Sequence, residues 1–329
     1  IFPTSTSTVE VQVEKTSDGN IAKIDVDQTA LQLLDTFANQ DAVRHYRDLI
    51  EDLQVNGFEV FVCLNHFTLP LWIHDPITAR KTRLRHGPKG WVDEKTIVEF
   101  IKYAAYMAWK FGDLVKYWAT FNEPMVVAEG GYMISESGFP PGLRNAFRVY
   151  RRVAMHLVIA HARSYDAIKT HCSSANVGLI HNVIPAMPLS SEKMSDVKAA
   201  EYLNMMHNLF FIQSVSKGWL DENLNVVKEK GEIEHGLGNR LDWIGVNYYS
   251  RLVVKGRAFM LAKYVAGTSV IPSVVPGFGF ASQPYSKSNA GLLTSAIGWE
   301  LYPEGLLDAL KAMKIFGKPI YVTENGISD

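Results

Sequence analysis

Short, nearly unbroken apolar runs alternate along the chain with stretches in which apolar residues recur every three or four positions. Runs of this kind are expected of strands that are buried on both faces. They predict five strands, at 58–65, 115–121, 177–180, 243–249 and 320–323. The helical spacing predicts helices through 43–53, 94–111, 143–170, 193–216 and 304–316. Strands that alternate with helices indicate a parallel sheet with right-handed crossovers.

Local signals mark several ends of these elements. Asp93 is expected to cap the helix that follows it, and Gly57 and Gly317 to end two others. Residues 9–26 read as a β-hairpin that turns at Asp18-Gly19. Residues 251–298 are rich in Gly, Ser and Pro and are expected to form a long loop excursion of functional importance. Since no linker is visible, 1–329 is interpreted as a single domain.

Composition narrows the class of protein. The chain is 47% hydrophobic with a formal net charge of −1, which excludes a disordered chain and non-specific binding of nucleic acid. No apolar run is long enough to span a bilayer, so no membrane partner is expected. The two cysteines, Cys63 and Cys172, form no disulfide framework and favour the reducing cytoplasm.

Polar side chains gather where the predicted strands end. Four of the five strands run into such residues: Asn65-His66, Asn122-Glu123-Pro124, Asn247-Tyr248-Tyr249 and Glu324-Asn325-Gly326. In a parallel barrel the carboxyl ends of the strands form one rim, which carries the active site. Carboxylate, amide, imidazole and phenol groups are therefore expected together at that rim.

Two of these residues, Glu123 and Glu324, suit glycoside hydrolysis. Such enzymes use one carboxyl group as a general acid and a second as nucleophile or base. A separation of about 5–5.5 Å between the carboxyl groups leads to retention of configuration, and about 6.5–9.5 Å to inversion. Pro124 is expected to fix the backbone after Glu123, and Gly326 to permit a tight turn after Glu324.

At these residues the sequence resembles family 1 of the glycoside hydrolases, the β-glucosidase and β-galactosidase family. The two leading motifs are Thr120-Phe121-Asn122-Glu123-Pro124 and Val322-Thr323-Glu324-Asn325-Gly326. Supporting stretches occur in the family's order at 1–3, 65–66, 139–142, 245–249, 298–300 and 303–306. Residues 71–76 are most similar to the archaeal β-glycosidases.

The resemblance implies a (β/α)8 barrel and a retaining exo-β-glycosidase that works by double displacement. It implies that Glu324 is the nucleophile and Glu123 the acid/base. Asn122 and His66 would bind sugar hydroxyls, Tyr249 would hydrogen-bond to Glu324, and Asn247 would lie near the site. Implied substrates are β-glucosides, β-galactosides or oligosaccharides, with no cofactor. A homo-tetramer is implied by analogy with the archaeal group. Phe67 departs from the family, which usually has Trp there, and this is expected to shift substrate preference.

The resemblance also implies that the sequence is partial. Aligned by motif, it lacks roughly strands 1, 2 and 8 of the barrel and keeps five strand–helix units. As written, the chain is expected to show weak or no hydrolysis and poor solubility, because free sheet edges and inner side chains would face water.

Other interpretations remain open. An endo-acting barrel glycosidase with the same paired glutamates is one alternative, and an inactive or sugar-binding fragment is another. A metal site is not expected, since His156 and His161 do not share a helix face and His74 and His86 lie in a polar loop. No glycine-rich nucleotide motif is present. The basic cluster Arg80, Lys81, Arg83 and Arg85 is interpreted as a solvated loop or a subunit contact.

Overall fold

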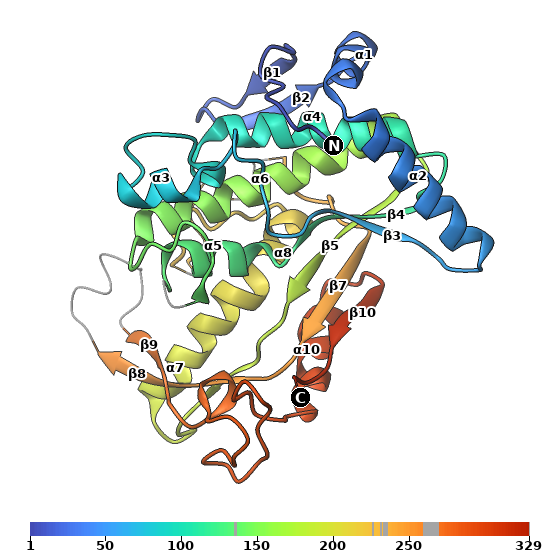
Figure 1. Cartoon of the computed structure of the whole chain (residues 1–329). Helices are drawn as coiled ribbons and strands as arrows, with labels where there is room; N and C mark the ends of the chain where they lie inside the picture. Colours follow the sequence, from blue (N-terminus) through green and yellow to red (C-terminus); the bar gives the residue numbers. More distant parts are fainter. Residues whose placement is uncertain (135–136, 226, 231, 233–235, 259–269, 329) are drawn as a thin grey trace. The chain divides into compact units, whose positions relative to one another are not determined.

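The computed structural model describes residues 1–134, 137–225, 227–230, 232, 236–258 and 270–328 (Figure 1). The chain divides into two compact units. Unit 1 comprises Ile1–Leu179 and His235–Trp243, and unit 2 comprises Ile180–Glu234 and Ile244–Asp329. Each unit is described by itself.

Unit 1 holds the N-terminal half of the strand and helix alternation. Its elements are β1 (Gln12–Lys15), β2 (Ile21–Asp25), α1 (Gln28–Phe37), α2 (Gln40–Val55), β3 (Phe61–Asn65), α3 (Pro76–Lys81), η1 (Gly90–Val92), α4 (Glu94–Phe111), β4 (Tyr117–Asn122), α5 (Pro124–Tyr132), α6 (Phe147–His171) and the first part of β5 (Asn176–Asn182). The parallel pairing of β3 with β4 confirms the expected sheet type, and β5 follows β4 in the strand order.

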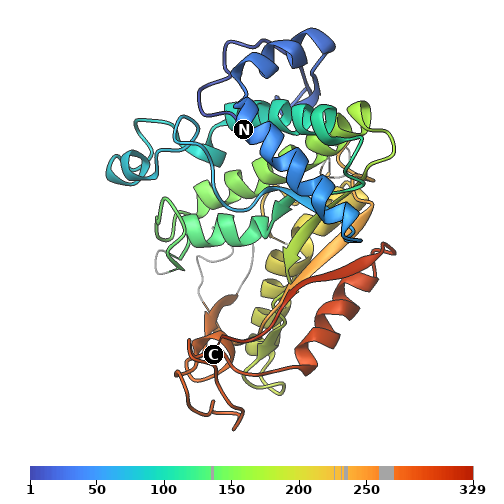
Figure 2. The ribbon, with the colours of Figure 1, turned by 45° about the vertical axis from the view of Figure 1, so that its right-hand side comes forward.

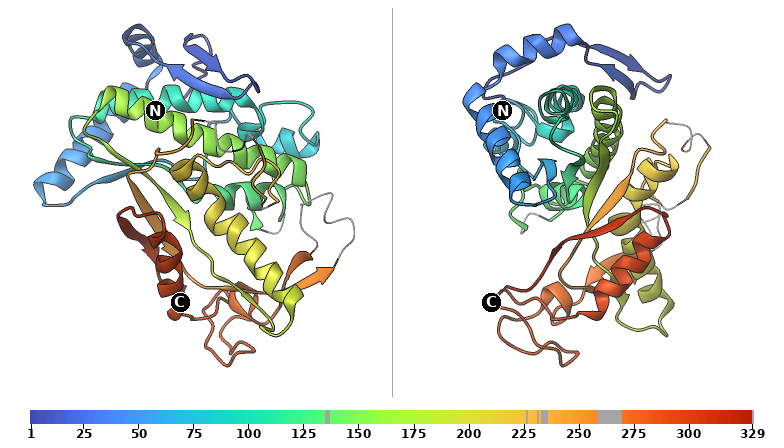
Figure 3. Two further views of the ribbon diagram at one scale, coloured as in Figure 1. Left: turned by 180° about the vertical axis from the view of Figure 1, so that it is seen from behind. Right: turned by 90° about the vertical axis from the view of Figure 1, so that its right-hand side faces the viewer.

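Two long helices form the centre of unit 1. α4 packs along α6, and Figure 1 shows the two side by side. Each of them buries residues on more than one face. The antiparallel β1–β2 hairpin turns at Gly19, whose φ of +84° requires little strain in glycine, as expected. In Figure 3 the hairpin is the dark blue pair of strands next to α1.

Some local expectations for unit 1 were incomplete. Asp93 stands at the N-cap of α4, but its side chain makes no capping hydrogen bond. α1, α3 and α5 were not predicted, because they are short or lack a clean apolar stripe. Their signals were nevertheless present: Asp27 and Asp75 cap α1 and α3 through their side chains, and Pro124 opens α5.

Unit 2 holds the end of β5 and the later elements. These are β6 (Ala186–Pro188), α7 (Met194–Leu203), the π-helical segment η3 (Asn204–Leu209), α8 (Phe210–Lys217), β7 (Trp243–Tyr248), β8 (Leu252–Ala258), β9 (Val270–Val274), η4 (Gly279–Ala281), α10 (Glu304–Lys314) and β10 (Ile320–Asn325). β7 lies next to β5 in the strand order and pairs in parallel with β10. Figure 2 shows α10 and β10 in red.

The predicted loop at 251–298 contains regular structure, which corrects that expectation. β8 and β9 pair antiparallel and, with β6, form a separate three-stranded sheet. Residues 259–269 of this stretch lie outside the described residues. The strand signal was weak because β9 contains Pro272 and β8 contains Gly256.

The predicted helix at 193–216 is α7, η3 and α8 in one continuous rod (Figure 3). Within η3, the Asn208 amide accepts from the Ile184 N–H at 2.8 Å and donates to its carbonyl at 2.9 Å. Asn204 makes the same pair of bonds with Ala186, at 3.0 and 2.8 Å. The two asparagine side chains thus bond to the backbone of residues 184 and 186 in the way that a neighbouring strand would. The apolar pattern of the sequence does not reveal these bonds.

Candidate active site

In unit 1, Glu123 occupies the junction between β4 and α5. Its φ of 48° and ψ of 56° place it in the left-handed region, an uncommon conformation for a residue with a side chain. Its carbonyl accepts from the N–H groups of Val126 and Val127 at 3.0 and 3.3 Å, which closes the first turn of α5. The residue is 7% exposed. Pro124 disfavours the right-handed region for Glu123 but leaves the extended region open, so the left-handed conformation is set by the junction of β4 with α5 and not by the proline alone.

Asn122 and His66 come together from neighbouring strands. Asn122 Nδ2 lies 3.4 Å from His66 Nε2, which brings together two of the residues predicted to bind sugar. Asn122 is buried and His66 is exposed. The turn after β3 is held by Asn65, whose side-chain amide donates to the Thr68 carbonyl at 2.8 Å. Phe67 in this turn has a φ of 70° and its ring meets Phe139 edge-on.

Beneath β4 lies a neutral histidine. His161 Nε2 is 2.6 Å from the Arg240 carbonyl, so this nitrogen must carry a proton and donate. Thr120 Oγ lies 2.6 Å from Nδ1 and therefore donates to it. Burial lowers the pKa of His161 to about 4, despite the bond to Arg240, so the ring is neutral at pH 7. His161 thus fixes the strand that ends in Asn122 and Glu123.

In unit 2, a bulge in β10 directs the predicted nucleophile. Val322 is paired with Val246, and the next partners along the ladder are Glu324 and Asn247, so Thr323 is an extra residue. A bulge re-aims side chains locally. Here it lets two successive residues of β10 bond to the segment 247–249: Thr323 Oγ donates to Asn247 Oδ1 at 2.7 Å, and Glu324 accepts from Tyr249.

The hydrogen bond expected between Tyr249 and Glu324 is present. The phenol oxygen lies 2.6 Å from Glu324 Oε2. Because a carboxylate only accepts, the phenol donates, and this holds one carboxylate oxygen in place. Asn247 is fully buried, and its backbone carbonyl accepts from the Val183 N–H at 2.9 Å. Gly326 has a φ of 153° directly after β10, but residues 326–328 form no turn, so the tight turn expected after Glu324 is not observed.

Two neighbours of these residues were not predicted from the sequence. Thr323 orients Asn247, and the Trp299 ring packs against Tyr249 with centroids 5.6 Å apart. Thr323 gave no signal because a bulge cannot be read from alternation in a six-residue strand. Trp299 lay in one of the family stretches, at 298–300, and that position was the available signal.

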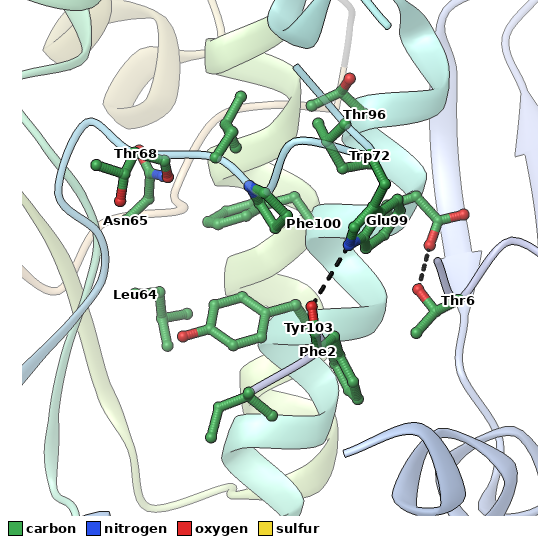
Figure 4. Close-up of a pocket in the computed structure, with 14 residues that line it drawn as sticks. Phe2, Thr6, Leu64, Asn65, Thr68, Trp72, Thr96, Glu99, Phe100 and Tyr103 are labelled. Carbon is green, nitrogen blue, oxygen red and sulfur yellow. Dashed lines mark hydrogen bonds between the residues drawn. The ribbon is translucent and has the colours of Figure 1, made fainter. Parts of the chain in front are cut away.

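A cavity of about 400 Å³ in unit 1 is lined by Asn65, one of the polar residues expected at the strand ends, but by none of the residues predicted for catalysis or sugar binding. Figure 4 shows its lining, including Trp72, whose indole N–H donates to the Phe2 carbonyl at 3.4 Å. Glu99, whose carboxylate also lines the cavity, accepts a hydrogen bond from Thr6 Oγ at 2.5 Å (Figure 4). The same carboxylate forms an ion pair with Lys102 at 2.9 Å. Trp72 and Glu99 therefore anchor the N-terminal segment at Phe2 and Thr6.

Two further histidines of unit 1 have structural roles. His156 Nδ1 lies 2.8 Å from the Trp91 carbonyl, to which it donates, and His74 is buried, which lowers its pKa. In the part of the chain that the structure describes, no cluster of three or more His, Cys, Asp or Glu could hold a metal ion. Within the same residues, no helix is long and apolar enough to cross a membrane.

Comparison with known proteins identifies the family. The model of glycosyl hydrolase family 1 matches residues 35–329. The chain belongs to this family. It is 41% identical to a β-galactosidase of Pyrococcus woesei over 100% of the chain and 65% of that protein. It is 39% identical to a β-galactosidase of Sulfolobus acidocaldarius over 100% of the chain and 63% of that protein.

Solved family 1 structures have the same fold. The β-glycosidase from Thermosphaera aggregans superimposes with a TM-score of 0.86 at 39% identity, over 100% of this chain and 64% of that one. The β-glucosidase from Pyrococcus furiosus has a TM-score of 0.83 at 38% identity, over 100% and 62%. The expected α/β class, five parallel strands of a (β/α)8 barrel, and the likeness to archaeal β-glycosidases are thereby confirmed. The chain spans 63–65% of the length of the two β-galactosidases.

Proposed function

We propose that this family 1 chain carries the catalytic groups of a retaining exo-β-glycosidase. The observation that supports this best is the hydrogen bond from Tyr249 to Glu324 Oε2 at 2.6 Å. A neutral donor on one carboxylate oxygen fixes the direction of the group, which a nucleophile requires. The other oxygen is then the one that attacks the sugar.

The proposed reaction has two displacements. In the first, a Glu324 oxygen bonds to the anomeric carbon while the bond from that carbon to the leaving oxygen breaks, and Glu123 gives its proton to that oxygen. In the second, the Glu123 carboxylate takes a proton from water as the water oxygen attacks the same carbon. The bond to Glu324 breaks, and the sugar leaves with its original configuration.

The remaining predicted residues serve binding and orientation in this proposal. Asn122 and His66, which lie 3.4 Å apart, bind sugar hydroxyls. Contacts of this kind accelerate the reaction when they strengthen in the transition state. Asn247 is held by Thr323 and lies next to Glu324 in the ladder, so it orients the sugar or the nucleophile.

The proposed substrates are β-glucosides, β-galactosides and short β-linked oligosaccharides. Relatives bear the names β-galactosidase and β-glucosidase, which supports this range. No cofactor is included, because two carboxyl groups supply both the proton and the nucleophile. Residues 1–329 are proposed to belong to a single catalytic barrel domain.

We also propose a cytoplasmic homo-oligomer, with a tetramer as the working model. Cys63 and Cys172 are not joined in a disulfide, which suits a reducing compartment. One solved relative is described as derived from a hyperthermophilic tetrameric structure. Light scattering of the purified chain measures the mass and tests the assembly.

A covalent trap tests the function. The chain is incubated with a 2-deoxy-2-fluoro aryl β-glucoside and analysed by peptide mass spectrometry, and in parallel its turnover of an aryl β-glucoside is measured. The expected result is a glycosyl adduct on Glu324, with weak turnover at most by the wild-type chain and none by Glu324→Gln. A folded sample with neither adduct nor turnover contradicts the proposal and favours the sugar-binding or inert alternative. Greater activity on polysaccharide than on the aryl glycoside favours the endo-acting one.

A further inference from the structure

In unit 2, the segment 249–251, which begins with Tyr249, contacts the segment 299–300 through each of its three residues. Ser250 Oγ donates to the Glu300 carbonyl at 2.8 Å, and Arg251 Nε donates to Glu300 Oε2 at 2.6 Å. The residue before Glu300 is Trp299, whose ring packs on Tyr249. Tyr249, Ser250 and Arg251 therefore each contact the segment 299–300. Tyr249 is also the residue that donates to Glu324.

The charges in this joint are buried and held on several sides. Glu300 is 1% exposed, and its Oε2 also accepts from the Gly279 N–H at 3.2 Å. The Arg251 guanidinium stacks over the Tyr302 ring, 4.1 Å from its centroid. Burial opposes ionisation of Glu300, but the bonds and charge of Arg251 outweigh it, and the pKa of the carboxyl lies below its usual range. The pair is thus ionised in place.

A third segment, 279–280, contacts both of the first two. The Phe280 N–H donates to the Arg251 carbonyl at 3.1 Å, and the Phe280 ring meets Trp299 edge-on with centroids 4.7 Å apart. Gly279 has a φ of +53°, and a Cβ there would stand 2.0 Å from the Arg251 carbonyl oxygen. Only glycine allows residue 279 to approach the Arg251 carbonyl this closely.

A buried ion pair is weak as a source of stability, because desolvation offsets most of the attraction. The contribution of this pair is geometric: the bond from Arg251 Nε to Glu300 Oε2 and the stacking of the guanidinium on Tyr302 together restrict how the two segments are oriented. We propose that Arg251 and Glu300 form a positioning pair that holds Trp299 against Tyr249 and thereby directs the Tyr249 hydroxyl onto Glu324. This rests on the proposed function, since it assigns the pair to placing the nucleophile. Neither residue touches the substrate in this proposal.

The test measures the rate of covalent labelling at Glu324. At saturating 2-deoxy-2-fluoro aryl β-glucoside, Glu300→Gln is expected to slow labelling about tenfold, while the half-saturating concentration changes less than about threefold. Arg251→Lys keeps the charge but loses the Nε donor to Glu300 Oε2 and the stacking on Tyr302, and is expected to behave in the same way. It serves as the second variant should Glu300→Gln fail to fold, as judged by circular dichroism.

A double-mutant cycle separates positioning from general damage. If the pair acts through the Tyr249 hydroxyl, adding Glu300→Gln to Tyr249→Phe slows labelling by less than about threefold more, because the hydroxyl is already absent. Asp196→Asn is the matched control: Asp196 is another buried carboxylate of unit 2 that accepts a backbone N–H, from Gly256 at 2.9 Å. It is expected to label at the wild-type rate.

The outcomes are distinct. Independent, multiplicative effects in the double variant, or normal labelling of both single variants, overturn the positioning role while leaving the proposed function intact. A wild-type chain that is folded but not labelled overturns the proposed function, and the positioning role falls with it.

Discussion

The hydroxyl of Tyr249 and the carboxylate of Glu324 are joined by a hydrogen bond of 2.6 Å between residues that are 75 positions apart in the sequence. Two features of unit 2 bring them together. The bulge at Thr323 turns the end of β10, and Trp299 supports the tyrosine ring. The orientation of Glu324, the proposed nucleophile, is therefore a property of three separate segments.

Removing that hydroxyl tests its part in catalysis. Tyr249→Phe is expected to lower kcat/KM for an aryl β-glucoside by about 10- to 100-fold, since a hydrogen bond to a charged group contributes about 1.5–3 kcal/mol. Tyr248→Phe is the matched control, because the Tyr248 hydroxyl donates to the Tyr302 carbonyl instead. It should reduce thermal stability and leave kcat/KM within about threefold. Equal losses of kcat/KM in both variants would contradict the assignment.

Thr323 is expected to act on Asn247. Thr323→Val removes the donor to Asn247 Oδ1 and should reduce the free energy of unfolding by about 1–3 kcal/mol, because that oxygen is buried. It should also raise KM, since the amide loses its fixed orientation. Thr323→Ser keeps the hydroxyl and is expected to restore KM. Urea unfolding and steady-state kinetics measure the two effects, and a Val variant as stable as the Ser variant argues against the bond.

The left-handed backbone at Glu123 predicts an unusual order of stabilities. A left-handed conformation costs a residue with a Cβ about 1–2 kcal/mol, and glycine escapes this cost. Glu123→Gly is therefore expected to be more stable than Glu123→Ala by about 0.5–1 kcal/mol, after the larger unfolded-state entropy of glycine is subtracted. At Glu129, inside α5, the order should reverse. Thermal unfolding of four variants, with Gly or Ala at position 123 and Gly or Ala at position 129, measures the two orders.

Stability is expected to fall between pH 6.5 and 4.5. The pKa of His161 drops from 6.5 to about 4 on burial, so in this window the unfolded chain binds a proton that the folded chain does not. The folded state thus loses about 2–3 kcal/mol as the pH falls. His161→Gln can keep both the donor and the acceptor and should reduce this loss. Burial also lowers the pKa of His181, to about 3, so part of the pH dependence is expected to remain. Urea unfolding across this range measures both.

The buried pair Glu99–Lys102 is expected to be important for stability. Lys102 is 2% exposed and also donates to the carbonyls of Thr6 and Val9, at 2.9 and 3.0 Å. Lys102→Met removes these bonds and leaves the carboxylate without its cation, at an expected cost of about 3–5 kcal/mol. Lys102→Met combined with Glu99→Gln should recover part of it. A single variant that unfolds at the wild-type urea concentration would show that the pair is dispensable.

The sequence by itself determined the five parallel strands, most of the long helices and the polar residues at the strand ends. These are short-range properties: an apolar run predicts a buried strand, and the residue that follows it lies at the sheet edge. Asn122, Glu123, Asn247 and Glu324 were found in this way, and the family motifs then supplied their expected roles.

Only the tertiary structure decided how those residues are held. The bulge at Thr323, the left-handed Glu123, the π segment at 204–209 and the Arg251–Glu300 pair each depend on partners that are distant in sequence or on packing at a junction. Periodicity carries no record of such contacts, since it reports which face of an element is buried and not what it meets there. The candidate residues for the chemistry were therefore readable from the sequence, and their orientation was not.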